Sequence, residues 1–221
     1  MDTSEDPRPN LDIRTPHNAK ITRYPTGHTE VTLYPHRNRA PQSDSAARRG
    51  ERSEPSAWSR LPEETRRERN QDRSIRRSRA RFRAHCLELQ VDRIITLTTR
   101  ANITDREQFH SLVKKWMRLN RDQGKELNAV GVFERQKRGA WHIHFAVSGH
   151  QDVNYLRRNW IHVCESGSVN IAYKPGPIRR LVMYLSKYLT KGMSETVNGC
   201  HRYLRSGRIP TSVPEILRGY P

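Results

Sequence analysis

Polar and apolar side chains alternate along the middle of the chain, where residues 133–147 read FERQKRGAWHIHFAV. Side chains two positions apart on a strand point to the same face, so His142 and His144 lie side by side. The opposite face of this strand is apolar and consists of Trp141, Ile143, Phe145 and Val147. Another strand precedes it, and a tight basic turn centred on Arg138 places Glu134 directly across from His142.

The remaining strands are predicted from β-branched content and from alternation. Residues 93–99 read RIITLTT and form a strand, with one face suited to the core. Thr96 and Thr98 share the other face, whose hydroxyls can meet a ligand. Residues 169–173 alternate as a further strand, and residues 200–209 are expected to add an edge strand.

Helices are predicted where apolar residues recur every three or four positions. Residues 104–107 read as a capping box ahead of a core-facing helix over residues 109–119, and Asp152 is expected to cap a short helix. Pro177 suits the first position of a further helix that runs to about Lys191. This order of elements predicts an α+β fold, in which a mainly antiparallel central sheet has helices packed on one face.

The parts of the chain differ in composition, and this difference predicts its domains. Residues 91–221 are expected to form the folded domain. Residues 61–90 form a basic helical segment, for which a solvated face and a phosphate-contacting face both remain open. Residues 1–60 are rich in Pro, Ser, Arg and Asp and are expected to be a largely disordered basic arm. A hairpin over residues 21–34 is the one structured element predicted within this arm.

Charge adds a partner to this picture. The chain of 221 residues has 41 Lys and Arg against 23 Asp and Glu, a formal net charge of +18. Such an excess indicates a polyanionic partner and favours nucleic acid, without distinguishing DNA from RNA. No apolar run approaches membrane-spanning length, so we expect a soluble, intracellular protein that does not act at a membrane.

The cysteines argue for a reducing compartment. Cys86, Cys164 and Cys200 are far apart and odd in number, which disfavours a disulfide framework. Each has a histidine nearby, namely His85, His162 and His201. A structural zinc site is therefore open, but no CxxC spacing supports one and solitary thiols are favoured.

The strand pair supplies a candidate metal site. Two imidazoles and one carboxylate suit a divalent ion and leave some of its coordination positions open. Glu134, His142 and His144 are therefore the predicted metal ligands. A lone His-x-His is often found without any metal. Here the glutamate in register and the apolar opposite face favour metal binding, and a second motif strengthens this interpretation.

That second motif lies in residues 183–192, MYLSKYLTKG, which contain Tyr-x-x-Lys twice. On a helix, Tyr184 and Tyr188 stack one turn apart, as do Lys187 and Lys191. A single tyrosine of this kind is more simply a boundary residue whose hydroxyl meets water. The doubled motif, downstream of the two histidines, favours catalysis. A tyrosine hydroxyl can attack a phosphodiester and keep the bond energy as phosphotyrosine, while a cation polarises the phosphate and a lysine stabilises its charge.

The ordered set ITLTT, FERQKRGAWHIHF and YLSKYLTKG resembles the HUH endonuclease superfamily. It is most similar to the two-tyrosine rolling-circle replication initiators (Rep) of small phages and plasmids. The resemblance covers about residues 76–208 and implies a fold with a ferredoxin-like or RRM-like core. It implies that Glu134, His142 and His144 are the metal ligands. It also implies that Tyr184 and Tyr188 are the nucleophiles, with Lys187 and Lys191 beside them.

The resemblance further implies an enzyme that nicks and joins one strand of DNA at an origin through a 5′-phosphotyrosine. Its cofactor is expected to be Mg²⁺ or Mn²⁺, and its partner a single-stranded DNA origin. No Walker loop follows the motifs, so unwinding is expected from a host helicase, with synthesis by a host polymerase. The expected location is the cytoplasm of a bacterial or phage-infected bacterial cell.

Three alternatives are open. Within the superfamily, a transposase or a plasmid-mobilisation relaxase is the nearest, although a tyrosine downstream of the histidines argues against relaxases with an N-terminal tyrosine. A non-catalytic nucleic-acid-binding protein of the same fold is the second, and cleavage with a covalent adduct discriminates against it. A ribosome-like or RNA-binding basic protein is the third, but it leaves the histidines and tyrosines unexplained.

Overall fold

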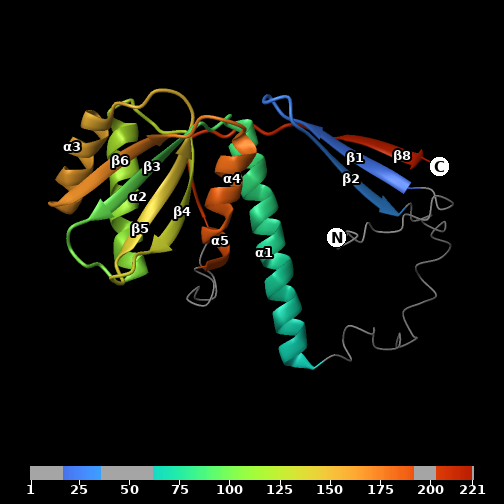
Figure 1. Cartoon of the computed structure of the whole chain (residues 1–221), viewed down its shortest axis with the longest axis horizontal. Coiled ribbons are helices and arrows are strands. Elements are labelled where there is room, and N and C mark those ends of the chain that lie inside the picture. Colours follow the sequence, from blue (N-terminus) through green and yellow to red (C-terminus); the bar gives the residue numbers. More distant parts are fainter. Residues whose placement is uncertain (1–16, 36–61, 192–202, 221) are drawn as a thin grey trace, which may run out of the picture. The chain divides into compact units, whose positions relative to one another are not determined.

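The computed structural model describes residues 17–35, 62–191 and 203–220 of the chain (Figure 1). The chain divides into a small unit, formed by residues 1–56 and 212–221, and a larger unit formed by residues 57–211. None of the helices within the described residues is both long and apolar enough to pass through a bilayer.

The larger unit is built on a five-stranded sheet with the strand order β6-β3-β5-β4-β7. Its strands are β3 (Arg93–Thr99), β4 (Ala129–Arg135), β5 (Trp141–Val147), β6 (Gly167–Tyr173) and β7 (Leu204–Ser206). All of the pairings are antiparallel, and β7 pairs with β4 at one edge, as the sequence predicted. The predicted α+β class with a mainly antiparallel central sheet is therefore confirmed.

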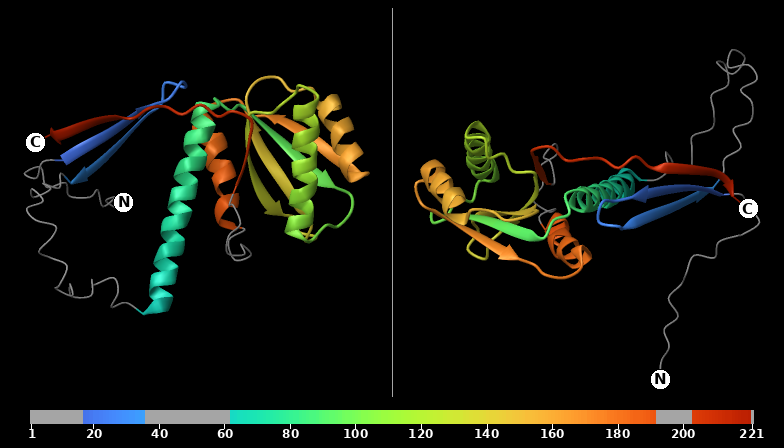
Figure 2. Two further views of the ribbon diagram at one scale, coloured as in Figure 1. Left: turned by 180° about the vertical axis from the view of Figure 1, so that it is seen from behind. Right: turned by 90° about the horizontal axis from the view of Figure 1, so that it is seen from above.

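Helices cover both faces of this sheet, whereas the sequence predicted helices on one face only (Figure 2). They are α1 (Glu63–Glu88), α2 (Arg106–Asp122), α3 (Val153–Cys164), α4 (Ile178–Ser186) and α5 (Tyr188–Lys191). α2 and α3 pack on the face that carries Phe145. The other face, which carries Val132 and Ala146, packs against α1, α4 and α5. Because β4 and β5 have apolar side chains on both faces, each face requires a cover.

The N-terminal ends of α2 and α3 are capped by aspartates. Asp105 rather than Thr104 caps α2, because the Asp105 Oδ1 accepts a hydrogen bond from the Glu107 backbone N–H at 2.8 Å. The predicted box over residues 104–107 is therefore displaced by one residue. Asp152 caps α3, as predicted, and accepts from the Asn154 backbone N–H at 3.0 Å.

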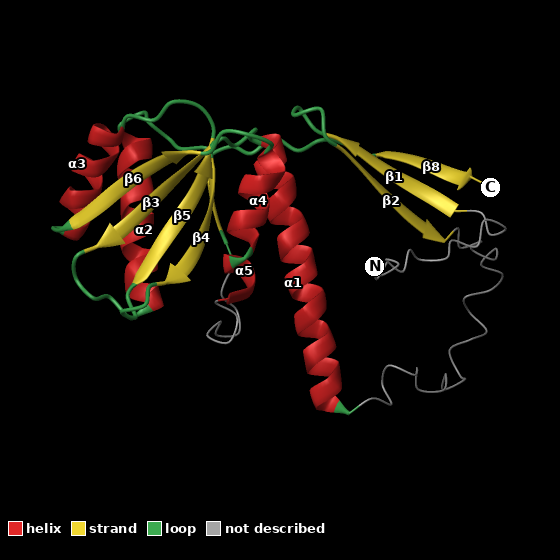
Figure 3. Ribbon diagram, viewed as in Figure 1, coloured by secondary structure: helices red, strands yellow, loops and turns green. Residues whose placement is uncertain are grey.

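The small unit is an antiparallel sheet with the order β2-β1-β8 (Figure 3). Its strands are β1 (His17–Arg23), β2 (Thr29–Pro35) and β8 (Glu215–Tyr220). The predicted hairpin is present, and Gly27 takes a φ of +77° in its turn, which suits glycine. The sequence missed β8. Because the β8 backbone pairs with β1, residues 212–221 group with the hairpin and not with the expected domain at 91–221. The rest of the predicted arm lies outside the described residues.

Candidate metal centre and tyrosine pair

The candidate metal centre lies on the face of the sheet that α1, α4 and α5 cover. Glu134 in β4 is the direct cross-strand partner of His142 in β5, as the predicted turn requires. His144 lies two positions farther along β5, on the same face. The Glu134 Oε2 is 2.9 Å from the His142 Nε2 and 3.1 Å from the His144 Nε2. The structure therefore brings the three predicted ligands together around one carboxylate oxygen.

The donor atoms of this cluster satisfy the chemistry of a divalent cation. One ligand atom from each of Glu134, His142 and His144 lies within 4.8 Å of the others. Both histidines are buried, and the Glu134 side chain is only 17% exposed. In the part of the chain that the structure describes, this is the one group of three or more metal-type donors.

A hydroxyl from the neighbouring strand holds the second ring nitrogen of His144. The Thr96 Oγ1 lies 2.9 Å from the His144 Nδ1, and the two residues are cross-strand partners in β3 and β5. A carboxylate can only accept, so with Glu134 accepting from the Nε2–H, the Nδ1 accepts from the Thr96 hydroxyl. If the Nε2 binds a cation, the same hydroxyl can accept from an Nδ1–H instead. Thr96 is thus the ligand-facing hydroxyl that the sequence predicted.

The electrostatic setting favours neutral imidazoles. Burial lowers the pKa of His144, the neighbouring His142 lowers it further, and Glu134 acts in the opposite direction. A neutral ring has the lone pair that a metal ligand needs. The His142 Nδ1 is buried and has no hydrogen-bond partner among the described residues. Its ring instead meets the His144 ring at a centroid distance of 4.6 Å and an angle of 75°.

The two predicted tyrosines lie next to this cluster. The Tyr188 ring stacks on the His144 ring, with centroids 5.1 Å apart and planes 26° apart. Tyr184 meets Tyr188 edge to face, with centroids 5.4 Å apart. Tyr184 is 41% exposed, whereas Tyr188 is partly buried. The repeated Tyr-x-x-Lys motif therefore has two different settings, one against the cluster and one nearer the solvent.

The helix that carries the tyrosines is interrupted between them. The sequence predicted one helix to about Lys191, but α4 ends at Ser186 and α5 begins at Tyr188. At the junction, the Lys187 backbone N–H donates to the Tyr184 carbonyl oxygen at 3.3 Å, a tighter turn than an α-helix makes. The break lets Tyr188 lie on its own short helix over His144.

Burial also sets the protonation state of Tyr188. Burial raises the pKa of the Tyr188 phenol well above its usual range, and the hydrogen bond with Tyr184 and the charge of Glu134 raise it further. Tyr188 is therefore a neutral phenol at ordinary pH when no cation is near. A positive charge close to its oxygen is needed to favour the phenolate.

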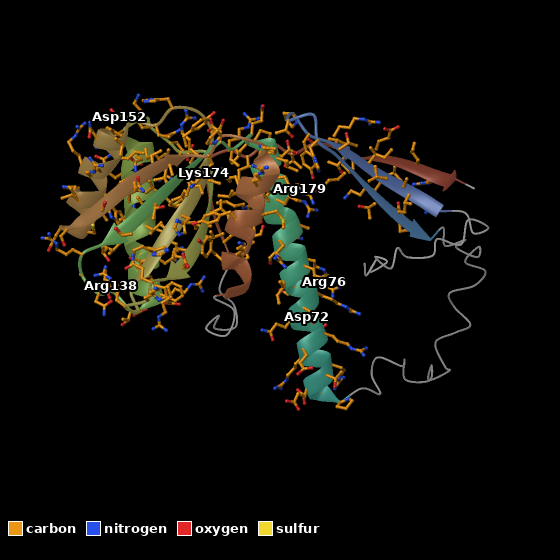
Figure 4. The ribbon with its side chains drawn as sticks, in the orientation of Figure 1. Asp72, Arg76, Arg138, Asp152, Lys174 and Arg179 are labelled. Atoms are coloured by element: carbon orange, nitrogen blue, oxygen red, sulfur yellow. The ribbon has the colours of Figure 1, made fainter. Side chains whose placement is uncertain are left out.

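Cations near the tyrosines come from more than the predicted motif. Lys187 is exposed at the α4–α5 junction, and Lys191 is the last residue of α5, with its side chain outside what the structure describes. Sequence reasoning missed Lys174, whose Nζ lies 5.9 Å from the Tyr184 ring centroid (Figure 4). Lys174 follows β6 directly, and no motif spacing connects it with the tyrosines.

Basic side chains also surround the turn that joins β4 and β5. The Arg138 guanidinium donates to the carbonyl oxygens of Thr99 and Arg100, at 2.5 and 3.1 Å (Figure 4). The Arg135 Nε donates to the Gly139 carbonyl oxygen at 3.0 Å. These bonds tie the predicted basic turn to the end of β3, on the side of the sheet where Glu134 and His142 begin the cluster.

No zinc site forms at the cysteines that are described. Cys86 is a buried free thiol in the core beneath α1, and burial raises the pKa of its thiol. Cys164 is a free thiol at the end of α3. Cys200 and His201 lie outside the described residues.

Residues 92–193 match the model of a family described as replication-associated protein ORF2. The matched segment contains the three cluster residues and both tyrosines, and it excludes α1 and the small unit. No curated protein and no solved structure matches the chain.

Proposed function

We propose, on the premise that residues 92–193 belong to the replication-associated protein ORF2 family, that this chain starts rolling-circle replication by nicking one DNA strand at an origin. The family and the Rep-like fold support a role in DNA replication. The nicking chemistry and its dependence on a metal are the proposal. In it, a tyrosine oxygen attacks the scissile phosphodiester and holds the new 5′ end as a phosphotyrosine.

The observation that carries the proposal is the contact between Tyr188 and His144, whose rings stack at 5.1 Å. A candidate nucleophile and a candidate metal ligand, 44 positions apart in the sequence, lie in direct contact. A purely structural tyrosine has no reason to be next to two histidines and a glutamate. A tyrosine that must reach a phosphate held at a cation does have one.

The residues present fit a divalent cation, Mg²⁺ or Mn²⁺. Glu134, His142 and His144 would hold it through the atoms that now hydrogen-bond to one another. Bound there, the cation would supply Lewis-acid polarisation of the phosphate and would favour loss of the tyrosine proton. Thr96 would hold the outer nitrogen of His144 and thereby fix the direction of its ring.

The remaining work belongs to the side chains of the chain itself. The tyrosine Oη forms a bond to phosphorus as the bond from phosphorus to the 3′ oxygen breaks, and the leaving 3′ oxygen takes up a proton. We propose that Tyr188 attacks first, because it touches the cluster, and that Tyr184 makes the second cut. Lys187 and Lys191 are proposed to stabilise the phosphate charge. Joining is the reverse reaction, in which a 3′ hydroxyl displaces the tyrosine.

The test uses single-stranded DNA that spans the origin of the replicon carrying this sequence, labelled at either end. With Mg²⁺ or Mn²⁺, we expect cleavage and a covalent adduct that mass mapping places on Tyr188 or Tyr184. Tyr155→Phe is the matched control, since Tyr155 lies on α3, on the other face of the sheet. Tyr184→Phe/Tyr188→Phe should form no adduct. Strand binding without cleavage in either metal would instead favour a non-catalytic nucleic-acid-binding protein.

A further inference from the structure

The first half of α1 has very little apolar surface to pack. From Glu63 to Arg81 the helix has almost no apolar residue except Ile75, and its buried residues are Phe82, Cys86, Leu87 and Glu88. The packing partners of α1 in its own unit are α4, α5 and β4. In Figures 1 and 2 its first half extends beyond α4 and α5. The helix is therefore longer than its packing requires.

This half of α1 is stabilised by its own charges. Glu63 and Glu64 lie in the first turn, where the helix dipole favours negative charge. Arg67 reaches back one turn to Glu63 with an N–O distance of 2.5 Å. A helix of 26 residues is also long enough to be favourable without full burial. The extended half is thus a straight element about 28 Å long, from about 19 residues at 1.5 Å each.

Charge is strongly segregated along α1. Residues 63–72 contain four acidic residues and three arginines, whereas residues 73–83 contain six arginines and no acidic residue. All six of these arginines are exposed: Arg73, Arg76, Arg77, Arg79, Arg81 and Arg83. Figure 4 shows the side chains of this half of the helix, with Asp72 and Arg76 labelled at the change from mixed to basic character. The basic half adjoins the domain that holds the candidate metal centre.

Three of these arginines form a straight row. Arg73, Arg77 and Arg81 are four positions apart, so they lie one above another on one face of the helix. A parallel row of short polar side chains lies beside them. Both rows line one shallow groove, whose residues are Asn70, Arg73, Ser74, Arg77, Ser78 and Arg81. Arg, Ser and Asn are among the side chains that contact DNA phosphates and base edges.

We infer that this face of α1, which we call the arginine face (Asn70, Arg73, Ser74, Arg77, Ser78 and Arg81), binds duplex DNA. A single strand is usually held by aromatic side chains on which bases stack, and residues 63–81 contain no aromatic residue. A helix about 10–12 Å across fits the major groove of B-form DNA, which is about 12 Å wide. The major groove of A-form RNA is too narrow to admit it. Charge complementarity therefore commits the face to duplex DNA.

This inference deepens the proposed function, since the duplex would be the replicon DNA that flanks the nick. The candidate metal centre would take the single strand, and α1 would hold the neighbouring duplex. Because α1 lies outside residues 92–193, the family match does not assign this contact. Binding by α1 needs no chemistry at the tyrosines, so the two proposals can fail separately.

The experiment measures binding of the full chain to a fluorescent duplex of arbitrary sequence and to a single strand of oligo(dT), each over a range of salt. The test variant is Arg73→Gln/Arg77→Gln/Arg81→Gln, since Gln removes charge and keeps good helix propensity. We expect duplex affinity to fall about tenfold or more. We also expect the salt slope to flatten by about 2.7, from three lost phosphate contacts at about 0.9 each. Binding of oligo(dT) should change little.

Two matched variants separate position from net charge. Lys114→Gln/Lys115→Gln/Arg158→Gln removes three exposed positive charges from α2 and α3, and it should leave duplex binding near that of the parent chain. Arg73→Lys/Arg77→Lys/Arg81→Lys keeps the charge and should retain most of the salt slope. Equal losses in the Gln variant and the α2–α3 variant would overturn the inference, as would an equal loss of oligo(dT) binding. Cleavage of an origin strand, assayed in the same variants, reports separately on the proposed function.

Discussion

The two faces of β5 differ in what one strand is asked to do. On one face, Ile143 and Phe145 are fully buried against α2 and α3. On the other, His142 and His144 lie among apolar side chains beneath α4 and α5, with Glu134 between them. Neighbouring residues in the sequence therefore belong to different tasks. The apolar face fixes the strand, and the fixed strand holds the two imidazoles without any loop having to move.

The largest expected effect comes from breaking the polar face. His144→Ala should abolish metal-dependent cleavage while leaving most DNA binding, because binding is mainly phosphate electrostatics. The assay is adduct formation on an origin strand with Mn²⁺, alongside a binding titration of the same strand. His150→Ala, an exposed histidine in the loop after β5, is the matched control and should cleave normally. Cleavage by His144→Ala at the parental rate would contradict the proposed role of this residue.

Breaking the apolar face should produce the opposite result. Ile143→Ala removes a fully buried side chain next to both histidines and should lower the free energy of unfolding by about 2–5 kcal/mol. Chemical denaturation measures this loss. At a temperature where the variant stays folded, its metal affinity should remain close to that of the parent chain. An unchanged unfolding free energy would show that the strand is not held by this face.

A smaller effect sharpens the comparison on the polar side. Thr96→Val removes the hydroxyl next to the His144 Nδ1 and keeps the shape and strand propensity of the side chain. Metal affinity should weaken by about 10- to 100-fold, the usual effect of losing a hydrogen bond to a ligand histidine. Calorimetric titration with Mn²⁺ measures it. Thr98→Val, on the same face of β3, is the control, and equal losses in both would assign the effect to the strand in general.

The smallest effect on cleavage is expected from the small unit. The larger unit contains the cluster, both tyrosines and α1, and residues 1–56 contribute no described residue to the candidate site. Deleting residues 1–56 should therefore leave a folded, metal-binding nuclease, with weaker DNA binding because several arginines are lost. Thermal unfolding and cleavage of an origin strand test this. An unfolded product would show that the larger unit depends on these residues.

The sequence predicted the cluster because strand periodicity is simple. Once the turn was centred on Arg138, the register of Glu134 against His142 followed, and the structure has that register. The tyrosine pair followed from helical spacing in the same way. Its adjacency to His144 did not, since no local pattern states which helix covers which face of a sheet. That adjacency depends on tertiary packing of Leu181 and Leu185 against the sheet.

Other features were out of reach for related reasons. α1 has a thin apolar seam, Phe82 and Cys86, so its place on the second face was not predicted. β8 is short and pairs with a strand almost two hundred residues away, which local patterns do not report. Lys174 reaches the ring of Tyr184 from the end of another strand.

The account rests on a covalent bond between DNA and Tyr188 that depends on the metal cluster. Its most direct test is mass mapping of the adduct formed by the full chain on an origin strand, with Mn²⁺ and with excess chelator. We predict a phosphotyrosine at Tyr188 with Mn²⁺, a slower one at Tyr184 in Tyr188→Phe, and none with chelator. Full cleavage in chelator, or an adduct on neither tyrosine, would contradict the account.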